Sequence, residues 1–439
     1  MTHPQTPLSG VIEVRVRGIL ARLKQEDART RFVFTEVYEK SALHEAGEAD
    51  RRRHLGLCLG PLDGVVVSVK DLFDIRGYKT SAGSRLLATH ATAALADAPA
   101  VQRLRAAGGI IIGRTSMSEL AFSGVGNNLY CGTPANPVDP ACIPGGSSSG
   151  AAVSVALGLA DIGLGSDTGG SLRIPAALCG VVGFKPSSGM VPTAGTFPLS
   201  ETLDTVGPIT ATVEGCMQAF AVLSGGCVPA MPARGPYRLG IVHDGRITDG
   251  TEDVVAQALQ QAKNRLGAKG VLLQSMDIAP VLDELAQIDA RGTFPSIELA
   301  ARLGALSDAD TALLDPAIWD RIRLGYHARA IDYLAMRQLR KSAIAHMQQL
   351  MQGVDAIMLA TVPVVAPLAA DLAEPEHFHA INSLLLRNTR IANLLNMPSI
   401  SIPLPVAGKP VGLMLWGRTD ADWALLHCAK EIETIVNDK

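Results

Sequence analysis

Blocks of apolar residues separated by polar ones indicate alternating strands and helices along the first half of the chain. Residues 64–75, GVVVSVKDLFDI, are rich in β-branched side chains and predict a buried strand that runs into a loop. Residues 97–108, DAPAVQRLRAAG, predict a helix, and the following GIIIGRT predicts the next strand. Residues 150–160, GAAVSVALGLA, are small and apolar, as in a helix packed closely against a sheet, and DIGLGSD then predicts a short strand.

The pattern along the rest of the chain completes the expected fold. Residues 11–55 predict two charged, alanine-rich helices, and residues 250–350 are mostly helical in pattern. The tail returns to strands in PSISIPLP and KPVGLMLWG, before a last helix from Asp420 to about Val436. This alternation predicts an α/β fold, with a central twisted sheet that is mixed but mostly parallel and is covered by helices on both faces.

Composition and charge narrow the class of protein. Of the 439 residues, 47% are hydrophobic and 18% are charged, which indicates a large buried core and argues against disorder. The net charge is −3 and no long basic run occurs, so we expect no nucleic-acid partner. The longest apolar window, residues 356–370, contains prolines and is too short for a membrane span, and residues 1–18 lack the apolar core of a secretory leader. We therefore expect a cytoplasmic protein without a membrane partner.

The cysteines and histidines give no sign of a metal centre. The seven cysteines are scattered and form no CxxC pair, so free thiols are expected rather than a zinc or redox site. His377 and His379 flank a phenylalanine, but no carboxylate or cysteine pattern accompanies them. We expect neither a metal nor a cofactor.

Two glycine–serine stretches carry the candidate chemistry: PGGSSSGAAVSV at 144–155 and GSDTGGSLRIP at 165–175. Flexible linkers should be polar on both sides, whereas these stretches lie within apolar, regularly patterned sequence. A phosphate-binding loop would require GxxxxGK, which is absent, and the GxGxxxG spacing of GLGSDTG is one residue too long for a dinucleotide site. A catalytic role is the interpretation that remains.

A serine nucleophile requires a base, and Lys70 is the candidate. None of the ten histidines lies in or beside the glycine-rich stretches, and no GxSxG motif occurs. Lys70 ends the apolar run GVVVSVK, and burial there would lower its pKa and leave a neutral amine able to accept a proton. From the local sequence alone, a lysine that reaches the surface or pairs with Asp71 fits equally well.

Several strings of the chain resemble the amidase signature family of hydrolases. They are GPLDGVVVSVKDLFDIRGYKTSAGS, PGGSSSGAAVSVA, LGSDTGGSLRIPAALCGVVGFKPSSG and LDTVGPI between residues 60 and 215, and later NMPSISIPLP and KPVGLMLWGR. The resemblance implies a Ser–Ser–Lys triad. Lys70 matches the family lysine, Ser147 the bridging serine that follows a cis peptide bond, and Ser171 the nucleophile, 24 residues after Ser147. Val66 departs from the pattern, because many members have proline there.

The resemblance also implies roles for the neighbouring residues. Backbone N–H groups of Thr168, Gly169, Gly170 and Ser171 are expected to hold the oxyanion, and Ser147 to contact the substrate. Ser148 is expected to support the loop, and Asp167 to shape it as a hydrogen-bond acceptor. Arg173 is expected to form a structural ion pair; pairing of Arg173 with a substrate carboxylate is the alternative.

The domain organisation follows from the same comparison. One domain is expected over residues 1–439, with a family core at about 60–215 and a helical, substrate-shaping region at about 235–350. The C-terminal strands and helix at 355–439 are expected to complete the same domain. The Pro/Gly-rich residues 226–235 are interpreted as a surface loop within it.

The expected activity is hydrolysis of a linear carboxamide to a carboxylate plus ammonia or an amine, through an acyl-serine intermediate. Two alternatives stay open: the A-type component of a tRNA-dependent amidotransferase, and a hydrolase of ureides such as biuret. Residues 117–128, 193–202 and 295–345 are the candidates for shaping a small-molecule amide site. Whether the protein forms a homodimer, which amide it cleaves and whether it needs a partner protein are left open.

Overall fold

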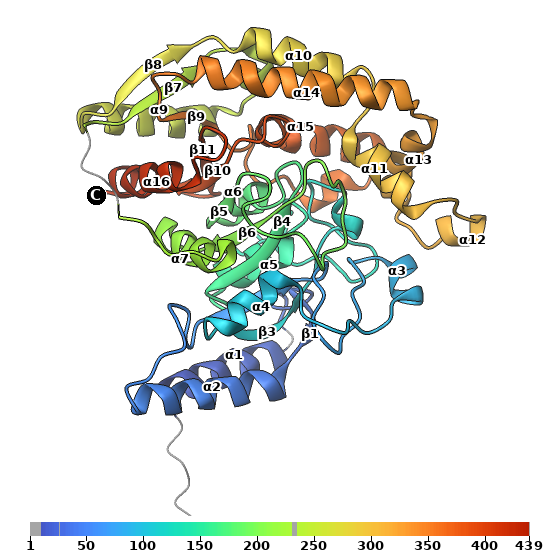
Figure 1. Ribbon diagram of the computed structural model, residues 1–439, viewed down its shortest axis with the longest axis vertical. Helices are drawn as coiled ribbons and strands as arrows, with labels where there is room; N and C mark the ends of the chain where they lie inside the picture. The colour runs from blue at the N-terminus through green and yellow to red at the C-terminus, as the bar shows by residue number, and fades with distance from the viewer. Residues whose placement is uncertain (1–9, 26, 231–234, 439) are drawn as a thin grey trace, which may run out of the picture.

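The computed structural model describes residues 10–25, 27–230 and 235–438 as a single domain built around one large sheet (Figure 1). Residues 231–234 of the predicted surface loop at 226–235 lie outside the described residues. Residues 1–9, half of the segment in which we expected no secretory leader, also lie outside them. No helix in the described ranges is long and apolar enough to cross a membrane.

Eleven strands form the sheet in the order β1-β3-β2-β4-β6-β5-β10-β11-β9-β7-β8. The strands are β1 (Phe34–Val37), β2 (Val66–Lys70), β3 (Ile110–Thr115), β4 (Ile162–Asp167), β5 (Val182–Lys185), β6 (Thr205–Thr210), β7 (Arg238–Val242), β8 (Leu272–Met276), β9 (Ala356–Ala360), β10 (Ser399–Leu404) and β11 (Val411–Trp416).

The α/β class is confirmed, but the expectation of a mostly parallel sheet is wrong. Four strand pairings are parallel. Six are antiparallel. The short connection between β10 and β11, residues 405–410, can join only antiparallel neighbours, because a parallel pair needs a crossover of about a dozen residues or more. This hairpin lies between β5 and β9 and therefore sets the antiparallel character of the centre.

Helices cover both faces of the sheet, as expected (Figure 1). The α-helices are α1 (Val11–Lys24), α2 (Glu39–His54), α3 (Arg85–His90), α4 (Pro99–Ala106), α5 (Ser149–Ala156), α6 (Arg173–Cys179), α7 (Val213–Ser224), α8 (Gly245–Thr248), α9 (Asp253–Ala268), α10 (Ala279–Asp289), α11 (Phe294–Leu303), α12 (Asp308–Thr311), α13 (Pro316–Arg323), α14 (Ala330–Leu350), α15 (Pro375–Leu394) and α16 (Asp422–Asn437). Short 3₁₀ turns occur at Glu119–Ala121, Leu324–His327 and Ala369–Leu372.

Successive residues of strand β3 contribute to different hydrophobic cores. Ile110 and Ile112 of β3 pack in the core that includes α1, α2 and α5, whereas Ile111 packs in the core that includes α4, α7 and α16. This alternation follows from the two-residue repeat of a β-strand. Strands that are covered on both faces read as continuous apolar runs, which is why the sequence pattern located β2, β3, β4, β10 and β11. The largely exposed strands β1, within the region predicted as two helices, and β8 were not predicted.

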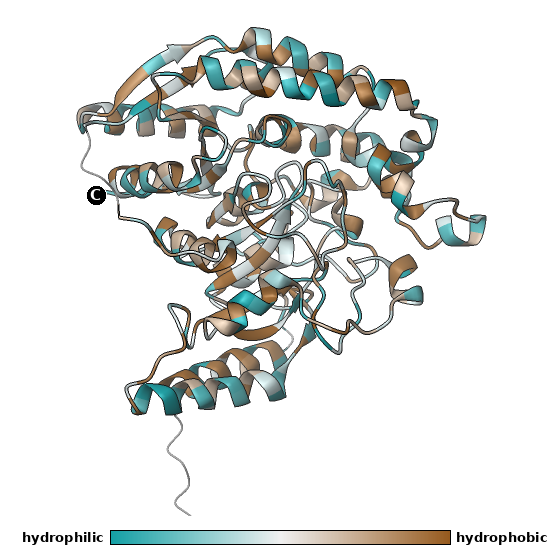
Figure 2. Cartoon of the chain, viewed as in Figure 1, coloured by the Kyte–Doolittle hydropathy of each residue, from teal (hydrophilic) through white to brown (hydrophobic). Residues whose placement is uncertain are grey.

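The helices between β7 and β9 cover both faces of this part of the sheet: α9 packs beside α16 on one face, and α10 and α14 pack on the other. The long helix α14 mixes hydrophilic and hydrophobic residues along its length (Figure 2) and buries Met336, Ala343 and Met347 in a core shared with α10 and α15. The prediction of a mostly helical region at 250–350 is confirmed for these residues, although it also contains β8. The further division of the domain into core, helical region and C-terminal part stays a prediction.

Candidate active site

Lys70 lies at the end of β2, and its side chain is completely buried. Its Nζ donates hydrogen bonds to Ser147 Oγ at 2.7 Å and to Ser166 Oγ at 2.8 Å. Asp71 forms an ion pair of 2.8 Å with Arg114 instead of with Lys70. The structure therefore excludes both alternatives that the local sequence left open, a surface lysine and a Lys70–Asp71 pair.

Burial lowers the pKa of Lys70 to about 7, although the negative charges of Asp167 and Asp204 act in the opposite direction. Desolvation disfavours the ammonium form, and nearby carboxylates offset only part of that effect. A substantial fraction of Lys70 is thus neutral at physiological pH, and a neutral amine can accept a proton from a serine hydroxyl.

The loop before Ser147 is shaped by two glycines in the left-handed region, Gly145 at φ 75° and Gly146 at φ 60°. A Cβ on Gly146 would lie 2.2 Å from Cδ of Pro175, so only glycine fits this turn against α6. The expectation of a cis peptide bond before Ser147 is not met, since the described residues contain no cis peptide bond. The two left-handed glycines make the reversal of the chain there instead.

Ser171 lies just before α6 and contacts the Ser147 loop through the backbone. The N–H of Ser147 donates to Ser171 Oγ at 3.2 Å, and the N–H of Ser148 donates to the carbonyl of Ser171 at 3.3 Å. Ser148 Oγ donates to the carbonyl of Ser166 at 3.1 Å, which fits its expected role as a loop contact. The structure thus brings Lys70, Ser147 and Ser171 together, although no hydrogen bond joins the two hydroxyls of Ser147 and Ser171 in the described part of the chain.

Asp167 organises the second glycine-rich loop. Its carboxylate accepts hydrogen bonds from the N–H of Gly170 at 2.8 Å and from the N–H of Leu172 at 3.0 Å. Arg173 donates to both carboxylate oxygens, at 2.9 and 3.1 Å, and Asn393 Nδ2 donates at 2.8 Å. Burial alone would raise the pKa of Asp167, but the Arg173 guanidinium and these hydrogen bonds lower it to about 2. Asp167 therefore stays ionised and shapes the loop.

Arg173 is completely buried and makes its ion pair with Asp167. Its other guanidinium hydrogen bonds go to the carbonyl of Thr389 at 2.9 Å and to Asn393 Oδ1 at 2.6 Å, both on α15. With these partners the guanidinium has no group free for a substrate carboxylate. The geometry is that of the structural ion pair, which was one of the two roles that the sequence left open.

The expected set of oxyanion donors changes at one position. The N–H of Gly170 is already bound by Asp167, and Gly170 does not line the cavity next to Ser171. Thr168, Gly169 and Ser171 do line it, and their three N–H groups have no hydrogen-bond partner within residues 10–25, 27–230 and 235–438. The N–H groups of Thr168, Gly169 and Ser171 thus stay the predicted donors for an oxyanion.

The cavity next to Ser171 has a volume of about 110 Å³ and is mostly apolar. Three segments expected to shape the substrate site contribute to it, through Phe122, Leu199 and Arg321. Its remaining walls come from the neighbours of Phe122, from the residue before Asp204, from the end of α10 and the start of α11 with the turn between them, and from α15: Ala121, Ser123, Leu203, Ile288, Asp289, Gly292, Thr293, Phe294, Pro295, Leu386, Arg390 and Leu394. Its size and lining fit a small organic molecule.

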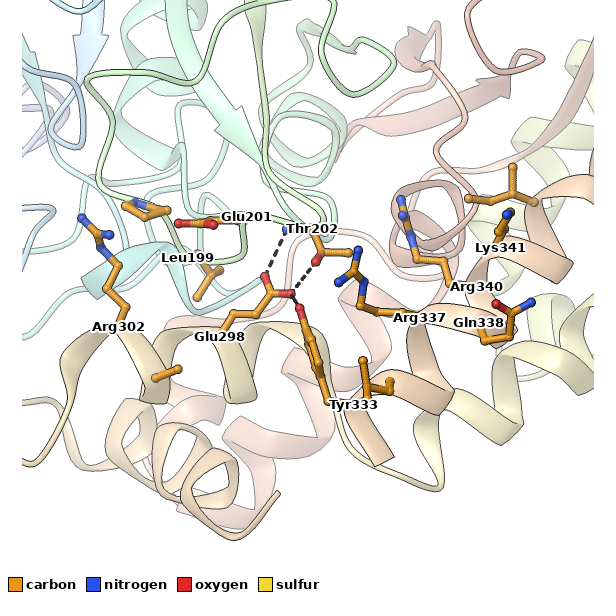
Figure 3. A pocket seen from close by; sticks show the side chains of 14 residues that line it. Leu199, Glu201, Thr202, Glu298, Arg302, Tyr333, Arg337, Gln338, Arg340 and Lys341 are labelled. Atoms are coloured by element: carbon orange, nitrogen blue, oxygen red, sulfur yellow. Dashed lines mark hydrogen bonds between the residues drawn. The ribbon is translucent and has the colours of Figure 1, made fainter. Parts of the chain in front are cut away.

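A larger open groove of about 1000 Å³ shares one lining residue, Leu199, with this cavity. Figure 3 shows Glu298 at its floor, where its carboxylate accepts hydrogen bonds from Thr202 and from the Tyr333 hydroxyl at 2.8 Å. Four basic side chains from α11 and α14 also line the groove: Arg302, Arg337, Arg340 and Lys341. None of the four forms an ion pair within the described ranges.

Sequence reasoning missed four residues of the site. Asp204 is half-buried near Lys70; desolvation raises its pKa to about 6, and it accepts hydrogen bonds from Thr168 Oγ1 and from the N–H groups of Leu199 and Ser200. The others are Ser166, Asn393 and Arg321. Asp204 stands in the LDTVGPI string, which was the one available signal, whereas Asn393 and Arg321 reach the site from distant helices.

No group of three or more His, Cys, Asp or Glu residues that could hold a metal ion occurs among the described residues, and His377 and His379 belong to none. The seven cysteines all lie in the described ranges, and none of them forms a disulfide. In this α/β fold the candidate side chains are thus Lys70 at the end of β2 and Ser147 and Ser171 on the two glycine-rich loops.

Comparison with known proteins identifies the family. The sequence profile named Amidase matches residues 16–426, and the chain belongs to this family. It is 36% identical over 399 residues to the 2-amino-5-chloromuconic acid deaminase of Comamonas testosteroni, covering 89% of this chain and 86% of that protein. It is 33% identical over 416 residues to the A-type component of the glutamyl-tRNA(Gln) amidotransferase of Halobacterium salinarum, covering 86% and 97%.

A solved structure described as an amidase superposes with a TM-score of 0.85 at 29% identity, covering 97% of this chain and 96% of that one. Family and fold together make this protein a hydrolase of carbon–nitrogen bonds other than peptide bonds.

Proposed function

We propose that this protein is an amidohydrolase in which Ser171 is the nucleophile, Ser147 carries the proton and Lys70 is the base. The observation that carries the proposal is the contact between a fully buried lysine and Ser147 Oγ at 2.7 Å, in a loop that also holds Ser171 through a backbone hydrogen bond. Neutral lysine paired with serine is a known variant of the nucleophile–base arrangement.

The first half of the reaction forms an ester. Ser171 Oγ attacks the amide carbonyl carbon and gives its proton to Ser147 Oγ, whose own proton passes to Lys70 Nζ. The negative charge that develops on the carbonyl oxygen is held by the free N–H groups of the Thr168, Gly169 and Ser171 loop; removal of one such donor typically costs about 10²–10³ in rate. The C–N bond then breaks, and the proton returns from Lys70 through Ser147 to the leaving nitrogen.

The second half releases the acid. Water gives a proton to Ser147 and on to Lys70 while it attacks the acyl group on Ser171, and collapse of this intermediate returns a proton to Ser171 Oγ. The relay requires the two serine hydroxyls to meet, and we propose that a change of side-chain rotamer at Ser171 brings them together when substrate binds; catalytic hydrogen bonds often tighten only in the complex. No step uses a metal or a cofactor, so we propose that metal chelators leave the activity unchanged.

The proposed substrate is a small linear carboxamide, hydrolysed to a carboxylate plus ammonia or an amine. The small, largely apolar cavity supports this size class. The name of the Comamonas relative describes a deaminase of an amino-substituted acid, which supports release of ammonia as one outcome. Hydrolysis of ureides such as biuret stays a prediction, as do a cytoplasmic location and a homodimer.

A role as the A-type component of a tRNA-dependent amidotransferase is the second candidate, because the chain matches 97% of the length of that protein from Halobacterium. The two functions differ in partner dependence. A stand-alone amidohydrolase releases ammonia from small amides as a purified single chain, whereas the amidotransferase component would need partner proteins for glutamine hydrolysis.

The test uses the purified full chain with a fluorophosphonate probe and a panel of small amides. We expect a covalent adduct on the peptide that contains Ser171, loss of adduct and turnover in Ser171→Ala, and a loss of at least about 10³-fold in turnover in Lys70→Ala. Ser224→Ala, a change of a distant surface-helix serine, serves as the control. Normal turnover in Ser171→Ala would refute the proposal.

A further inference from the structure

Glu298 joins the outer helices to the loop that precedes β6. The hydroxyl of Ser200 and the N–H of Thr202 donate to its Oε2 at 2.6 and 3.1 Å, and Thr202 Oγ1 donates to its Oε1. The hydroxyl of Tyr333, on α14, also donates to Oε1, at 2.8 Å; Figure 3 shows the bonds from Thr202 and Tyr333. One carboxylate on α11 therefore ties α11 and α14 to a single stretch of the loop.

The carboxylate of Glu298 binds the loop instead of a cation. Arg337 and Arg340 line the same groove, but neither forms an ion pair with Glu298 in the described part of the chain. Hydrogen bonds to an ionised carboxylate are short and about twice as strong as those between neutral groups. Several of them from one stretch of chain fix the direction of each donor. The carboxylate is therefore suited to hold the loop in one conformation.

The stretch that Glu298 binds is closed on itself. Residues 186–204 join β5 to β6 without a helix or strand. At their end, the carboxylate of Asp204 accepts hydrogen bonds from the N–H groups of Leu199 and Ser200 at 2.9 and 3.1 Å, and the N–H of Asp204 donates to the carbonyl of Ser200 at 2.8 Å. We call this the 199–204 turn. A long connection without regular structure depends on such contacts for its order.

The inner side of the 199–204 turn faces the reacting groups. Leu199 lines the cavity that holds the proposed nucleophile. Asp204 accepts a hydrogen bond from Thr168 Oγ1 at 2.5 Å, and the N–H of Thr168 is one of the predicted oxyanion donors. The negative charge of Asp204 also raises the pKa of Lys70. One turn thus contacts the cavity wall and the oxyanion loop, and it carries a charge that acts on the base.

We propose that Glu298 is a positioning residue for turnover, which holds the 199–204 turn in place beside the substrate cavity and the base. Glu298 lines the groove and not the cavity next to Ser171, so it acts through the turn and touches neither the substrate nor the proton relay. The inference rests on the proposed amidohydrolase function for its kinetic effect, whereas the hold on the turn does not require turnover.

The test measures turnover of a neutral amide by the full-length variants Glu298→Gln and Tyr333→Phe. Glutamine replaces one acceptor oxygen by a donor nitrogen, so donors of the turn lose their partner. We expect kcat to fall about tenfold or more in Glu298→Gln, because small displacements of reacting groups are costly, and to fall less in Tyr333→Phe, which removes one donor. Glu431→Gln, an exposed change on α16, is the control and should leave kcat unchanged. Thermal unfolding reports whether each variant folds, and Tyr333→Phe decides the question if Glu298→Gln does not fold.

The pH–rate profile separates positioning from a general loss of structure. The charges that act on Lys70 are those of Asp167 and Asp204, and of these two only Asp204 belongs to the turn. If Glu298→Gln releases the turn, Asp204 moves away from Lys70 and the profile should shift toward lower pH. Adding Asp204→Asn to Glu298→Gln should then give the shift of Asp204→Asn alone, since both changes remove the same charge effect. Shifts that add, or a kcat and a profile of Glu298→Gln that match the wild type, would overturn the inference.

If the wild type hydrolyses no amide, the proposed function fails, and hydrogen exchange decides the hold on the turn separately. The N–H groups of Leu199 and Ser200 are hydrogen-bonded inside the turn, so their exchange rates report how firmly it is held. Faster exchange in the peptide that spans residues 198–205 of Glu298→Gln, but not of Glu431→Gln, supports the inference. Exchange in Glu298→Gln at the wild-type rate overturns it.

Discussion

Lys70 Nζ and Ser147 Oγ lie 2.7 Å apart inside the protein, with the lysine side chain fully shielded from solvent. This contact joins two segments of the chain that are 77 residues apart in sequence. Its effect depends on protonation, because only the neutral amine can take a proton from the hydroxyl.

The pH dependence of turnover should therefore follow Lys70. Burial lowers the pKa of Lys70 to about 7, so the active, neutral form increases as the pH rises through about 7. We expect kcat/KM for a neutral amide to fall about tenfold per pH unit well below this value and to level off above it. A pH–rate profile that is flat between about pH 5 and 9 would contradict the assignment of Lys70 as the base.

Replacing Asp204 with Asn should shift that profile toward lower pH. The negative charge of Asp204 raises the pKa of Lys70, so its removal makes the lysine easier to deprotonate. The asparagine side chain can still accept a hydrogen bond from Leu199 N–H or Ser200 N–H, so the loop is expected to keep its course. The pH–rate profiles of Asp204→Asn and of the exposed control Asp283→Asn provide the comparison; an upward shift in Asp204→Asn would count against this electrostatic coupling.

Gly146→Ala should damage both folding and catalysis. The new Cβ would meet the Pro175 ring at 2.2 Å and would also force alanine to φ 60°. Gly158 is the matched control, because it has φ 66° and open space around its Cα. We expect Gly158→Ala to lower the free energy of unfolding by about 1–2 kcal/mol. Gly146→Ala should lower it further and reduce kcat by about 10²-fold or more, through displacement of Ser147.

Denaturant unfolding and steady-state kinetics on the two glycine variants measure this difference. Equal losses in both variants would mean that the backbone conformation alone, and not the contact with Pro175, makes glycine necessary at position 146.

Asp167→Asn should destabilise the protein strongly. It removes the carboxylate from a fully buried ion pair and leaves Arg173 uncompensated, which typically costs about 3–5 kcal/mol. The pKa of Asp167 is lowered from 3.8 to about 2, so the ionised carboxylate stabilises the fold above about pH 4 and this contribution is lost as the pH falls toward 2. The difference in unfolding free energy between wild type and Asp167→Asn should therefore shrink over that acid range. Asp283→Asn, in an exposed ion pair, should change stability by less than about 1 kcal/mol.

The sequence located strands β2, β3, β4, β10 and β11 and the glycine-rich loops, because buried strands and left-handed glycines leave local signals. The run GVVVSVK placed Lys70 at the end of a buried strand without any knowledge of the fold. Whether neighbouring strands run parallel or antiparallel could not be predicted in the same way, because at the centre of the sheet it depends on where the β10–β11 hairpin inserts. A local pattern carries no information on which strand a hairpin joins.

The parts of the site that were missed come from segments far away in the sequence. Asn393 contacts Asp167 across 226 residues, and Arg321 meets Phe122 across 199. Each lies on an amphipathic helix where a polar residue is ordinary, so nothing marked it before the packing was known. The Gly170 N–H was misassigned for a related reason: its bond to Asp167 depends on the detailed turn and not on the residue types.

The position of the β10–β11 hairpin has a consequence for biosynthesis. The strands made first, β1 to β6, and those made later, β7 to β9, have no direct pairing with each other, and the hairpin made last bridges them. Until the ribosome has released the chain beyond about residue 416, β5 and β9 both present open edges. Nascent chains should therefore depend on chaperones late in synthesis, and prematurely terminated products should be removed or aggregate rather than persist as partial enzymes.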